Sequence, residues 1–210
     1  MEYRLLGWPA DGVPLRLNHE RFAYAGKFVM TSTGKAVAAD PDSLDDDGRF
    51  PVPERPKTEY VDPVGAAAFN DDRTDDGALW IRYVTVRADR RGDGVGAALC
   101  RFVADRAADR GYRTVRIGVN NAYSYEALHK AGFAWTGRDT GLAELVLERP
   151  ADAPAAVDPE RYRAGLCEFR GRDDVGDDER GFVDRKLGAG PPAVDDADRP
   201  SRQGGEPPSR

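Results

Sequence analysis

A glycine-dense turn precedes the longest amphipathic segment of this 210-residue sequence. The turn spans residues 91–96, reads Arg-Gly-Asp-Gly-Val-Gly, and follows an apolar segment that ends at Val86. Glycine lets a backbone approach a ligand closely, and the unpaired N–H groups at the start of a helix bind phosphate oxygens. Residues 82–116 contain nine arginines and four aspartates, whereas the whole chain has a formal net charge of −6. The pattern therefore predicts a site for an anionic ligand such as a pyrophosphate.

A second group of polar residues follows the next alternating segment. Asn120 and Asn121 come directly after it, and a short stretch with helical spacing over residues 123–131 stops at Gly132. An asparagine at this position bonds a ligand or caps the helix that follows, and both interpretations stay open. Tyr123, Tyr125 and His129 add side chains that can donate or accept a proton. The alternatives are packing roles for the two tyrosines and an exposed position on the helix for His129.

The segments that must position these residues alternate between strand and helix periods. Strands are expected at 3–6, in an extended stretch over 22–38 with a turn at Gly34, and at 64–69, 79–86, 115–119 and 142–148; helices are expected at 94–110 and 123–131. Segments 64–69 and 79–86 are expected to pair as a hairpin. The order from residue 79 onward is then strand, helix, strand, helix, strand.

Two motifs together resemble those of the GNAT superfamily of acyl-CoA-dependent N-acyltransferases. Residues 86–96, Val-Arg-Ala-Asp-Arg-Arg-Gly-Asp-Gly-Val-Gly, look like its motif A, with the core Arg/Gln-x-x-Gly-x-Gly/Ala. Residues 119–121 and 125–133 are similar to its second motif, an asparagine at a strand end and a helix that ends in Gly-Phe. The resemblance implies an α/β (α+β) fold with a mixed, mostly antiparallel sheet and helices on both faces. A dinucleotide-binding loop fits poorly, because the next strand ends in Asn120 and not in an acidic ribose ligand.

The resemblance implies that acetyl-CoA is the co-substrate and that its thioester lies where two parallel strands separate. The residues expected to bind it are Val84, Thr85, Val86, Arg91, Gly92, Asp93, Gly94, Val95, Gly96, Ala97, Asn120 and Asn121. The implied reaction is attack of a primary amine, carried by a small molecule or a protein, on the thioester. An alkylammonium has a reference pKa of about 10 and a thiol of about 8.5, so a base and an acid are commonly required.

The sequence departs from the family at the residues that would supply that chemistry. The tyrosine that often acts as the acid aligns with Leu128, which leaves Tyr125, His129 and Tyr123 as candidate catalytic residues. The usual acidic base on the fourth strand is also missing. The possible substitutes, acting through water, are Asp72, Asp76, Glu126 and Glu144. These departures support an alternative function, a non-catalytic acyl-CoA-binding regulatory module.

Composition limits the classes of partner and compartment. An acidic chain without a domain-wide basic field is not expected to bind nucleic acid, and no run of about 18 apolar residues indicates a membrane segment. Two cysteines, Cys100 and Cys167, without a CxxC spacing predict neither a disulfide framework nor a metal site, which favours a cytoplasmic protein. The 26 Asp against 11 Glu and 26 Arg against 5 Lys suit a saline cytoplasm or a GC-rich genome.

The chain is expected to divide into three parts. Residues 1–150 form the N-acetyltransferase domain, 151–187 a helical extension in which Tyr162, Leu166 and Phe169 share one face, and 188–210 a disordered tail. The extension is expected to dock on the core or across a homodimer. A third interpretation makes the extension the main feature, with the acyltransferase core as a scaffold for interaction.

Overall fold

A seven-stranded mixed sheet forms the centre of the computed structural model, which describes residues 1–141 and 143–195. The strand order is β1-β2-β3-β4-β5-β7-β6. The strands are β1 (Glu2–Gly7), β2 (Gly34–Ala39), β3 (Gly65–Asp71), β4 (Ala78–Val86), β5 (Thr114–Val119), β6 (Ala134–Asp139) and β7 (Leu145–Pro150). Only the pair β4–β5 is parallel among these neighbours, which confirms the expected mixed, mostly antiparallel sheet.

The parallel pair is short and then separates. Backbone pairing of β4 with β5 runs from Ala78 opposite Thr114 to Ile81 opposite Ile117, although β4 continues to Val86. On its other side β4 stays paired with β3 up to Val86, with a register shift that leaves Arg82 as the extra residue of a bulge. The sheet therefore opens between β4 and β5 at the end where β4 meets the glycine turn.

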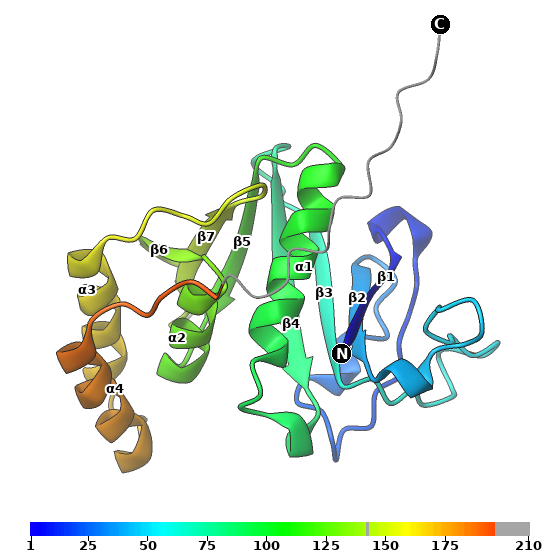
Figure 1. The fold of residues 1–210 in the computed structure, drawn as a ribbon, viewed down its shortest axis with the longest axis horizontal. Coiled ribbons are helices and arrows are strands. Elements are labelled where there is room, and N and C mark those ends of the chain that lie inside the picture. The colour runs from blue at the N-terminus through cyan, green and yellow to red at the C-terminus, as the bar shows by residue number, and fades with distance from the viewer. Residues whose placement is uncertain (142, 196–210) are drawn as a thin grey trace, which may run out of the picture.

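Four α-helices of the described residues lie along the sheet and at one end of it (Figure 1). They are α1 (Val95–Asp109), α2 (Ala122–Lys130), α3 (Pro159–Arg170) and α4 (Asp177–Ala189). Figure 1 shows α1 across the middle strands, and α3 and α4 side by side next to α2, at the end of the molecule away from β1. Four 3-10 turns, η1 (Pro9–Asp11), η2 (Ala25–Lys27), η3 (Pro41–Ser43) and η4 (Ala88–Arg90), lie in the connections of the described chain.

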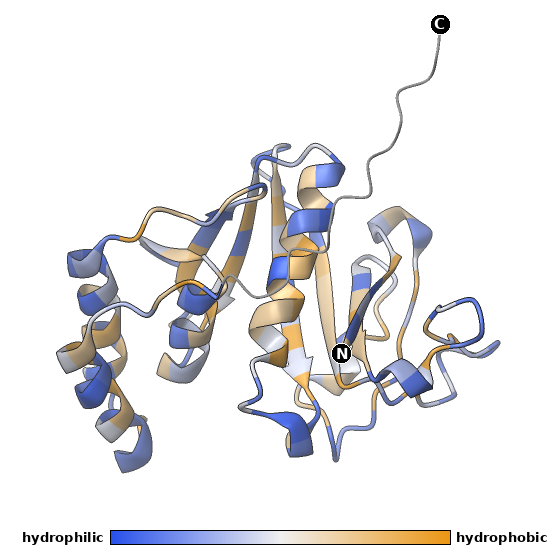
Figure 2. Cartoon of the chain, viewed as in Figure 1, coloured by the Kyte–Doolittle hydropathy of each residue, from blue (hydrophilic) through white to orange (hydrophobic). Residues whose placement is uncertain are grey.

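The two faces of the sheet are covered differently. Alternation along β3 sends Ala67 and Phe69 into one apolar cluster, which receives the buried side chains of all four helices. Ala66 and Ala68 enter a second cluster on the opposite face, which is closed by Phe22, Phe28 and their neighbours. The α-helices of the described chain therefore pack on one face of the sheet, whereas α-helices on both faces were expected. Figure 2 shows apolar residues concentrated in the strands and polar residues in the connecting turns.

One local expectation is wrong, and one strand was missed. Gly34 does not form a hairpin turn; it is the first residue of β2 and pairs with Phe69, whose ring occupies the space that a Cβ at position 34 would need. Strand β6 was not expected. Its register with β7 shifts between Trp135 and Asp139, and Gly137 has φ 82°, so the apolar alternation that signals a strand is interrupted.

The chain after β7 returns to the core through helices. Asp158 caps α3, because its Oδ1 accepts from the N–H groups of Glu160 (3.0 Å) and Arg161 (3.1 Å). After α4 the N–H of Asp195 donates to the carbonyl of Lys130 at 2.9 Å. The expected disordered tail falls largely on residues 196–210, outside the described residues, and the three-part division stays a prediction. Among residues 1–141 and 143–195, no helix has the length and apolar content of a membrane span.

Candidate active site

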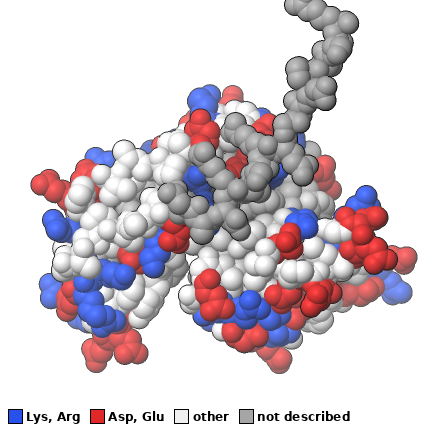
Figure 3. All heavy atoms as spheres, viewed as in Figure 1, with Lys and Arg blue, Asp and Glu red and all other residues white. Residues whose placement is uncertain are grey.

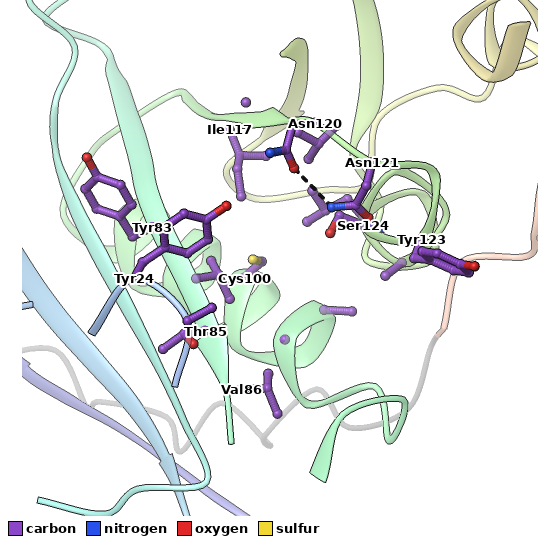
Figure 4. Close-up of a pocket in the computed structure, with 18 of the residues that line it drawn as sticks. Tyr24, Tyr83, Thr85, Val86, Cys100, Ile117, Asn120, Asn121, Tyr123 and Ser124 are labelled. Atoms are coloured by element: carbon purple, nitrogen blue, oxygen red, sulfur yellow. Dashed lines mark hydrogen bonds between the residues drawn. The ribbon is translucent and has the colours of Figure 1, made fainter. Parts of the chain in front are cut away.

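A cavity of about 590 Å³ occupies the gap between β4 and β5 (Figure 4). Helices α1 and α2 close it along its sides. Its lining consists of Ala23, Tyr24, Arg82, Tyr83, Val84, Thr85, Val86, Arg91, Gly96, Ala97, Cys100, Ile117, Gly118, Val119, Asn120, Asn121, Tyr123, Ser124, Ala127, Leu128 and Glu144. Figure 4 shows Thr85 and Val86 on the β4 side, Asn120, Asn121 and Ser124 across from them, and Tyr24 and Tyr83 together beside β4.

The glycine turn leaves the start of α1 free to bind an anion. Gly92 and Gly94 have φ 92° and 78°, a left-handed conformation that favours glycine, and nothing lies within 4 Å of a Cβ built on either. Gly94 is the N-cap and supplies no side-chain hydrogen bond, and the first helical bond runs from Ala98 N–H to its carbonyl. Within the described residues, the N–H groups at 95–97 have no partner, so they can donate to phosphate oxygens.

Two adjacent arginines of the turn have different surroundings. Arg90 contacts the carboxylates of Asp93 (3.3 Å) and Asp40 (3.4 Å), and these hydrogen bonds raise the pKa of its guanidinium. Arg91 lines the cavity, and its Nε lies 3.4 Å from the carbonyl oxygen of Val86. Arg91 is therefore the cation of the turn that faces the ligand space. Figure 3 shows this face of the molecule hollowed between two lobes, with basic and acidic side chains mixed beside the hollow.

The β4 wall of the cavity holds a hydroxyl without a partner. Thr85 is 4% exposed, and its Oγ1 makes no hydrogen bond within the described residues. Such a buried donor is costly unless a ligand or water satisfies it. Val84 and Val86 flank it, and a Cβ at Gly96 would lie 3.4 Å from Val86 Cγ2, so α1 packs closely on this strand. Thr85 is thus placed to bond a ligand that fills the gap.

The opposite wall begins with the two asparagines. Asn121 caps α2, because its Oδ1 accepts from Ser124 N–H at 2.8 Å, and its Nδ2 donates to Asn120 Oδ1 at 3.1 Å. Both residues also line the cavity. Of the two interpretations left open for Asn121, capping is present in the structure, and contact with a ligand in the same cavity is compatible with it.

The three candidate catalytic residues on α2 do not come together. Tyr125 is fully buried and donates to the carbonyl of Tyr162 at 3.2 Å, and burial raises its pKa. His129 is 5% exposed, its ring lies 4.8 Å from that of Tyr162, and burial lowers its pKa to about 4. Neither residue lines the cavity; both belong to the packing under α3. Tyr123 does line it, at the rim, with 47% of its surface exposed.

Helical spacing explains this division. Tyr123, Ser124, Ala127 and Leu128 turn toward the cavity, whereas Tyr125 and His129 occupy the other face of α2. Leu128, where the tyrosine acid was expected, borders the cavity with an apolar side chain that donates no proton. Ser124, one turn earlier, was not singled out from the sequence.

Glu144 is the carboxylate of the described residues that lines the cavity. Its Oε2 accepts from Thr140 Oγ1 at 3.2 Å and would lie 2.9 Å from a Cβ at position 118, so Gly118 makes room for it. Two of the other expected substitutes are engaged elsewhere. Burial opposes ionisation of Asp72, but hydrogen bonds from Thr74 and Arg116 outweigh it and lower its pKa to about 2. Glu126 accepts from Tyr162 and Lys186, both outside the cavity.

Asp76, the remaining substitute, is exposed and borders a separate hollow of about 330 Å³. Cys100 lines the main cavity, yet burial raises its pKa to about 12, so it stays a neutral thiol. No group of three or more metal-ligating side chains occurs in the part of the chain that the structure describes.

Sequence patterns missed the aromatic end of the cavity. Tyr24 and Tyr83 lie there with ring centroids 6.1 Å apart, and Lys27 Nζ lies 5.8 Å from the Tyr83 ring centroid. Tyr24 has φ 57°, which is uncommon for a residue other than glycine. The segment around it was expected to be extended, and no local spacing relates it to β4.

A parallel strand pair that separates beside an uncapped helix start fits an acyl-CoA-dependent transferase. The chain belongs to the acetyltransferase (GNAT) family, because the model of that family matches residues 21–133, more than half of the 210 residues. It is therefore an N-acetyltransferase that uses acetyl-CoA as its co-substrate. A comparison with curated proteins finds no match.

Solved structures give similarities of the same kind. Nourseothricin acetyltransferase is 20% identical, with 71% of this chain and 98% of that chain covered and a TM-score of 0.43. A Salmonella typhimurium protein described as an acetyltransferase, in complex with acetyl-CoA, is 23% identical over 60% and 69% of the chains, with a TM-score of 0.40. A GCN5-related N-acetyltransferase from Kribbella flavida is 22% identical over 56% and 67%, with a TM-score of 0.38.

Proposed function

We propose that this acetyltransferase modifies a primary amine of a small molecule or a protein, with the acetyl donor bound between β4 and β5. The observation that supports this most directly is the cavity itself. It has unpaired N–H groups and Arg91 at one end and the carboxylate of Glu144 in its lining. An anionic donor and an amine that must lose a proton need these two kinds of group in one space.

The proposed binding residues divide by the part of acetyl-CoA that they suit. The backbone N–H groups at 95–97 and the Arg91 guanidinium suit the pyrophosphate. The edge of residues 84–86 that β5 does not pair with and the side chains of Asn120 and Asn121 suit the amide groups of the pantetheine arm, with Thr85 Oγ1 as an added donor. Gly92 and Asp93 act indirectly, since they shape the turn and do not line the cavity.

Glu144 is the proposed base. The acceptor arrives as an ammonium and becomes a nucleophile when its proton passes to Glu144, directly or through a water molecule. The amine nitrogen then bonds the acetyl carbon as the bond from that carbon to sulfur breaks, and the nitrogen gives up its second proton to water as the amide forms. Leu128 offers no proton, and the mechanism that we propose uses no side-chain acid: sulfur leaves as a thiolate and takes its proton from water. We therefore expect kcat to rise with pH and then to stay constant. It should not fall at high pH, because no catalytic acid is there to lose its proton.

The test is a pair of glycine variants at the two ends of α1. Gly94→Glu places a carboxylate where the phosphates would bind, and it should abolish acetyl-CoA binding and turnover. Gly111→Glu is the matched control, because Gly111 also has a left-handed φ and free space around its Cβ but lies at the other end of the helix. Binding is measured by calorimetry, and turnover by thiol release against a panel of amines. Normal binding by Gly94→Glu would overturn the proposal.

The second candidate function is a non-catalytic acyl-CoA-binding regulatory module. The apolar Leu128 favours it, because the cavity then lacks a side-chain acid at the expected position. Both functions require acetyl-CoA binding, so turnover separates them. Tight binding without thiol release across a broad amine panel would support the module and contradict the enzyme.

Three further assignments are proposals as well. The unpaired thiols of Cys100 and Cys167 support a reducing compartment such as the cytoplasm. The boundary at residue 150 is supported by the helices after β7, whereas α4 continues to Ala189, two residues past the proposed boundary at 187. A homodimer is the third, and sedimentation velocity of the full chain tests it by giving the mass of the particle in solution.

A further inference from the structure

The wall of the cavity at residues 120–123 is held from outside the sheet. This wall segment joins β5 to α2 and contributes Asn120, Asn121 and Tyr123 to the cavity lining. Helices α3 and α4, with the turn between them, form a hairpin that lies beside α2 (Figure 1). The wall segment lines the cavity, and the hairpin contacts this segment at three points.

The first two contacts bind the backbone of the wall segment. Arg172, in the turn of the hairpin, donates from Nη1 to the carbonyl of Asn120 at 2.8 Å. Glu179, in the first turn of α4, accepts from the N–H of Ala122 at 2.6 Å. The Ala122 N–H is one of those that a helix start leaves unpaired, and a carboxylate there also interacts favourably with the helix dipole.

The third contact is between side chains. The ring of Phe182 on α4 lies 4.6 Å from the ring of Tyr123, centroid to centroid, at an interplanar angle of 42°. Tyr123 is 47% exposed and lies at the cavity rim, so Phe182 supplies the packing that fixes this ring. The hairpin thus contacts a carbonyl, an amide N–H and a side chain of this one short segment.

The hairpin is itself anchored to the buried face of α2. Glu126 accepts from the Tyr162 hydroxyl of α3 and from Lys186 of α4, and Tyr125 donates to the Tyr162 carbonyl. Phe169 and Val183 are fully buried in the same cluster. These contacts lie away from the cavity, so the anchor and the wall contacts can be perturbed separately.

We propose that Arg172, Glu179 and Phe182 are positioning residues for acetyl-CoA, and that the hairpin acts by fixing the cavity wall at residues 120–123. The inference rests on the proposed location of acetyl-CoA between β4 and β5. A wall segment that is free to change conformation must be ordered when the ligand binds, and that cost weakens binding. Because the hairpin already holds the wall segment in one conformation, this cost does not arise when the ligand binds. None of its three residues lines the cavity, so none is assigned to the chemical step.

The experiment compares variants of the hairpin in the full chain. Glu179→Ala should raise the KM for acetyl-CoA and the Kd of CoA measured by calorimetry by roughly tenfold, the effect of one charge-assisted hydrogen bond. Glu179→Gln keeps an acceptor for Ala122 N–H and should recover part of this loss. Arg172→Ala should act in the same direction. The KM for the amine and kcat should change less than twofold.

Asp184→Ala is the matched control. Asp184 pairs with Arg170 at 2.9 Å within the same hairpin, both side chains are more than half exposed, and neither contacts the wall segment. The control should leave the KM for acetyl-CoA unchanged. Equal effects of Glu179→Ala and Asp184→Ala, or unchanged CoA affinity in both Glu179→Ala and Arg172→Ala, would overturn the proposal.

Two further measurements keep the result interpretable. Melting temperatures identify any variant that loosens the whole hairpin. Phe182→Leu then replaces that variant, because leucine stays apolar but loses the ring contact with Tyr123, and it should still weaken CoA binding. Gly94→Glu tests the ligand location independently. Loss of CoA binding in Gly94→Glu with normal binding in the hairpin variants would refute the positioning role alone, whereas normal binding in Gly94→Glu would refute the ligand location.

Discussion

Glu144 can enter the cavity because the neighbouring strand has no side chain at position 118. A Cβ at position 118 would meet the Glu144 carboxylate, so Gly118 leaves the space that this carboxylate occupies. Glu144→Gln keeps the shape and removes the proton acceptor. We expect kcat to fall about 100-fold or more, the usual contribution of a general base, with an unchanged Kd for CoA.

The control for that experiment is Glu148→Gln. Glu148 lies on β7, pairs with Arg116 at 2.8 Å and is absent from the cavity lining, so the same change of charge should leave kcat within about twofold. Steady-state kinetics with a saturating amine provides the measurement. Similar kcat values for wild type and Glu144→Gln would remove Glu144 from the mechanism.

We expect His129 to affect stability, because it is buried outside the cavity. Burial lowers its pKa from 6.5 to about 4, so the unfolded chain takes up this proton at a higher pH than the folded protein does. The contribution to stability is present above about pH 6.5 and is lost as the pH falls through about 4. It corresponds to about 3 kcal/mol in the free energy of unfolding between pH 7 and pH 4.

Urea denaturation at several pH values tests this linkage. His129→Gln should show a smaller loss of stability on acidification than wild type, whatever its stability at pH 7. His19, the second histidine of the chain, is exposed, and His19→Gln should retain the wild-type pH dependence. Identical pH dependence in all three proteins would show that His129 does not titrate in this way.

Local spacing predicted some site residues and could not predict others. The glycines at 92 and 94 are required by backbone conformation, so the sequence itself reveals the turn. Tyr125 and Tyr123 are two residues apart on a helix and therefore point in different directions, but the sequence does not say which of them meets the cavity. That is decided by Tyr162, Phe169 and the rest of the hairpin, which the local pattern around residue 125 does not contain.

Among the elements, α1 was the most predictable and β6 the least. Helix α1 has a continuous apolar face, a glycine N-cap and Gly111 just after its end, and these signals agree with one another. Strand β6 is exposed over its second half and is interrupted by the glycine at 137, so its pairing with β7 supplies the order that its sequence lacks.

The hairpin of α3 and α4 depends on a buried polar contact, which makes one prediction at this scale. Tyr162→Phe keeps the ring and removes the hydroxyl that Glu126 accepts from, leaving Lys186 as the side chain bonded to that carboxylate within the described residues. We expect a loss of about 1–3 kcal/mol in the free energy of unfolding. Urea denaturation measures it.

Tyr123→Phe is the comparison for this measurement. The Tyr123 ring is 47% exposed, and its hydroxyl has no bond within the described residues, so its removal should change stability by less than about 0.5 kcal/mol. Equal stabilities of Tyr162→Phe and wild type would mean that the contact with Glu126 does not hold the hairpin.

Across the whole molecule, charge is distributed unevenly. A net charge of −6 gives no reason to expect an anionic ligand, yet Arg91 and the unpaired N–H groups of α1 border the main cavity. The arginine-rich stretch revealed this local polarity because its residues are close in sequence. The aromatic end at Tyr24 and Tyr83 stayed hidden, since its residues are brought together only by the packing of residues 15–28 over the sheet.

The short pairing of β4 with β5 also divides the sheet into two halves that meet at a short joint. Strands β1 to β4 form one half of the sheet and strands β5, β7 and β6 the other, and in the described sheet the pairing of Ala78–Ile81 with Thr114–Ile117 joins them. Val86 lies five residues beyond this joint, about 17 Å at the usual rise per residue, so a rotation of about 3° at the joint moves it by about 1 Å. The width of the cavity at its mouth therefore depends on the angle between the two half-sheets, and Ile117 belongs both to this joint and to the cavity lining.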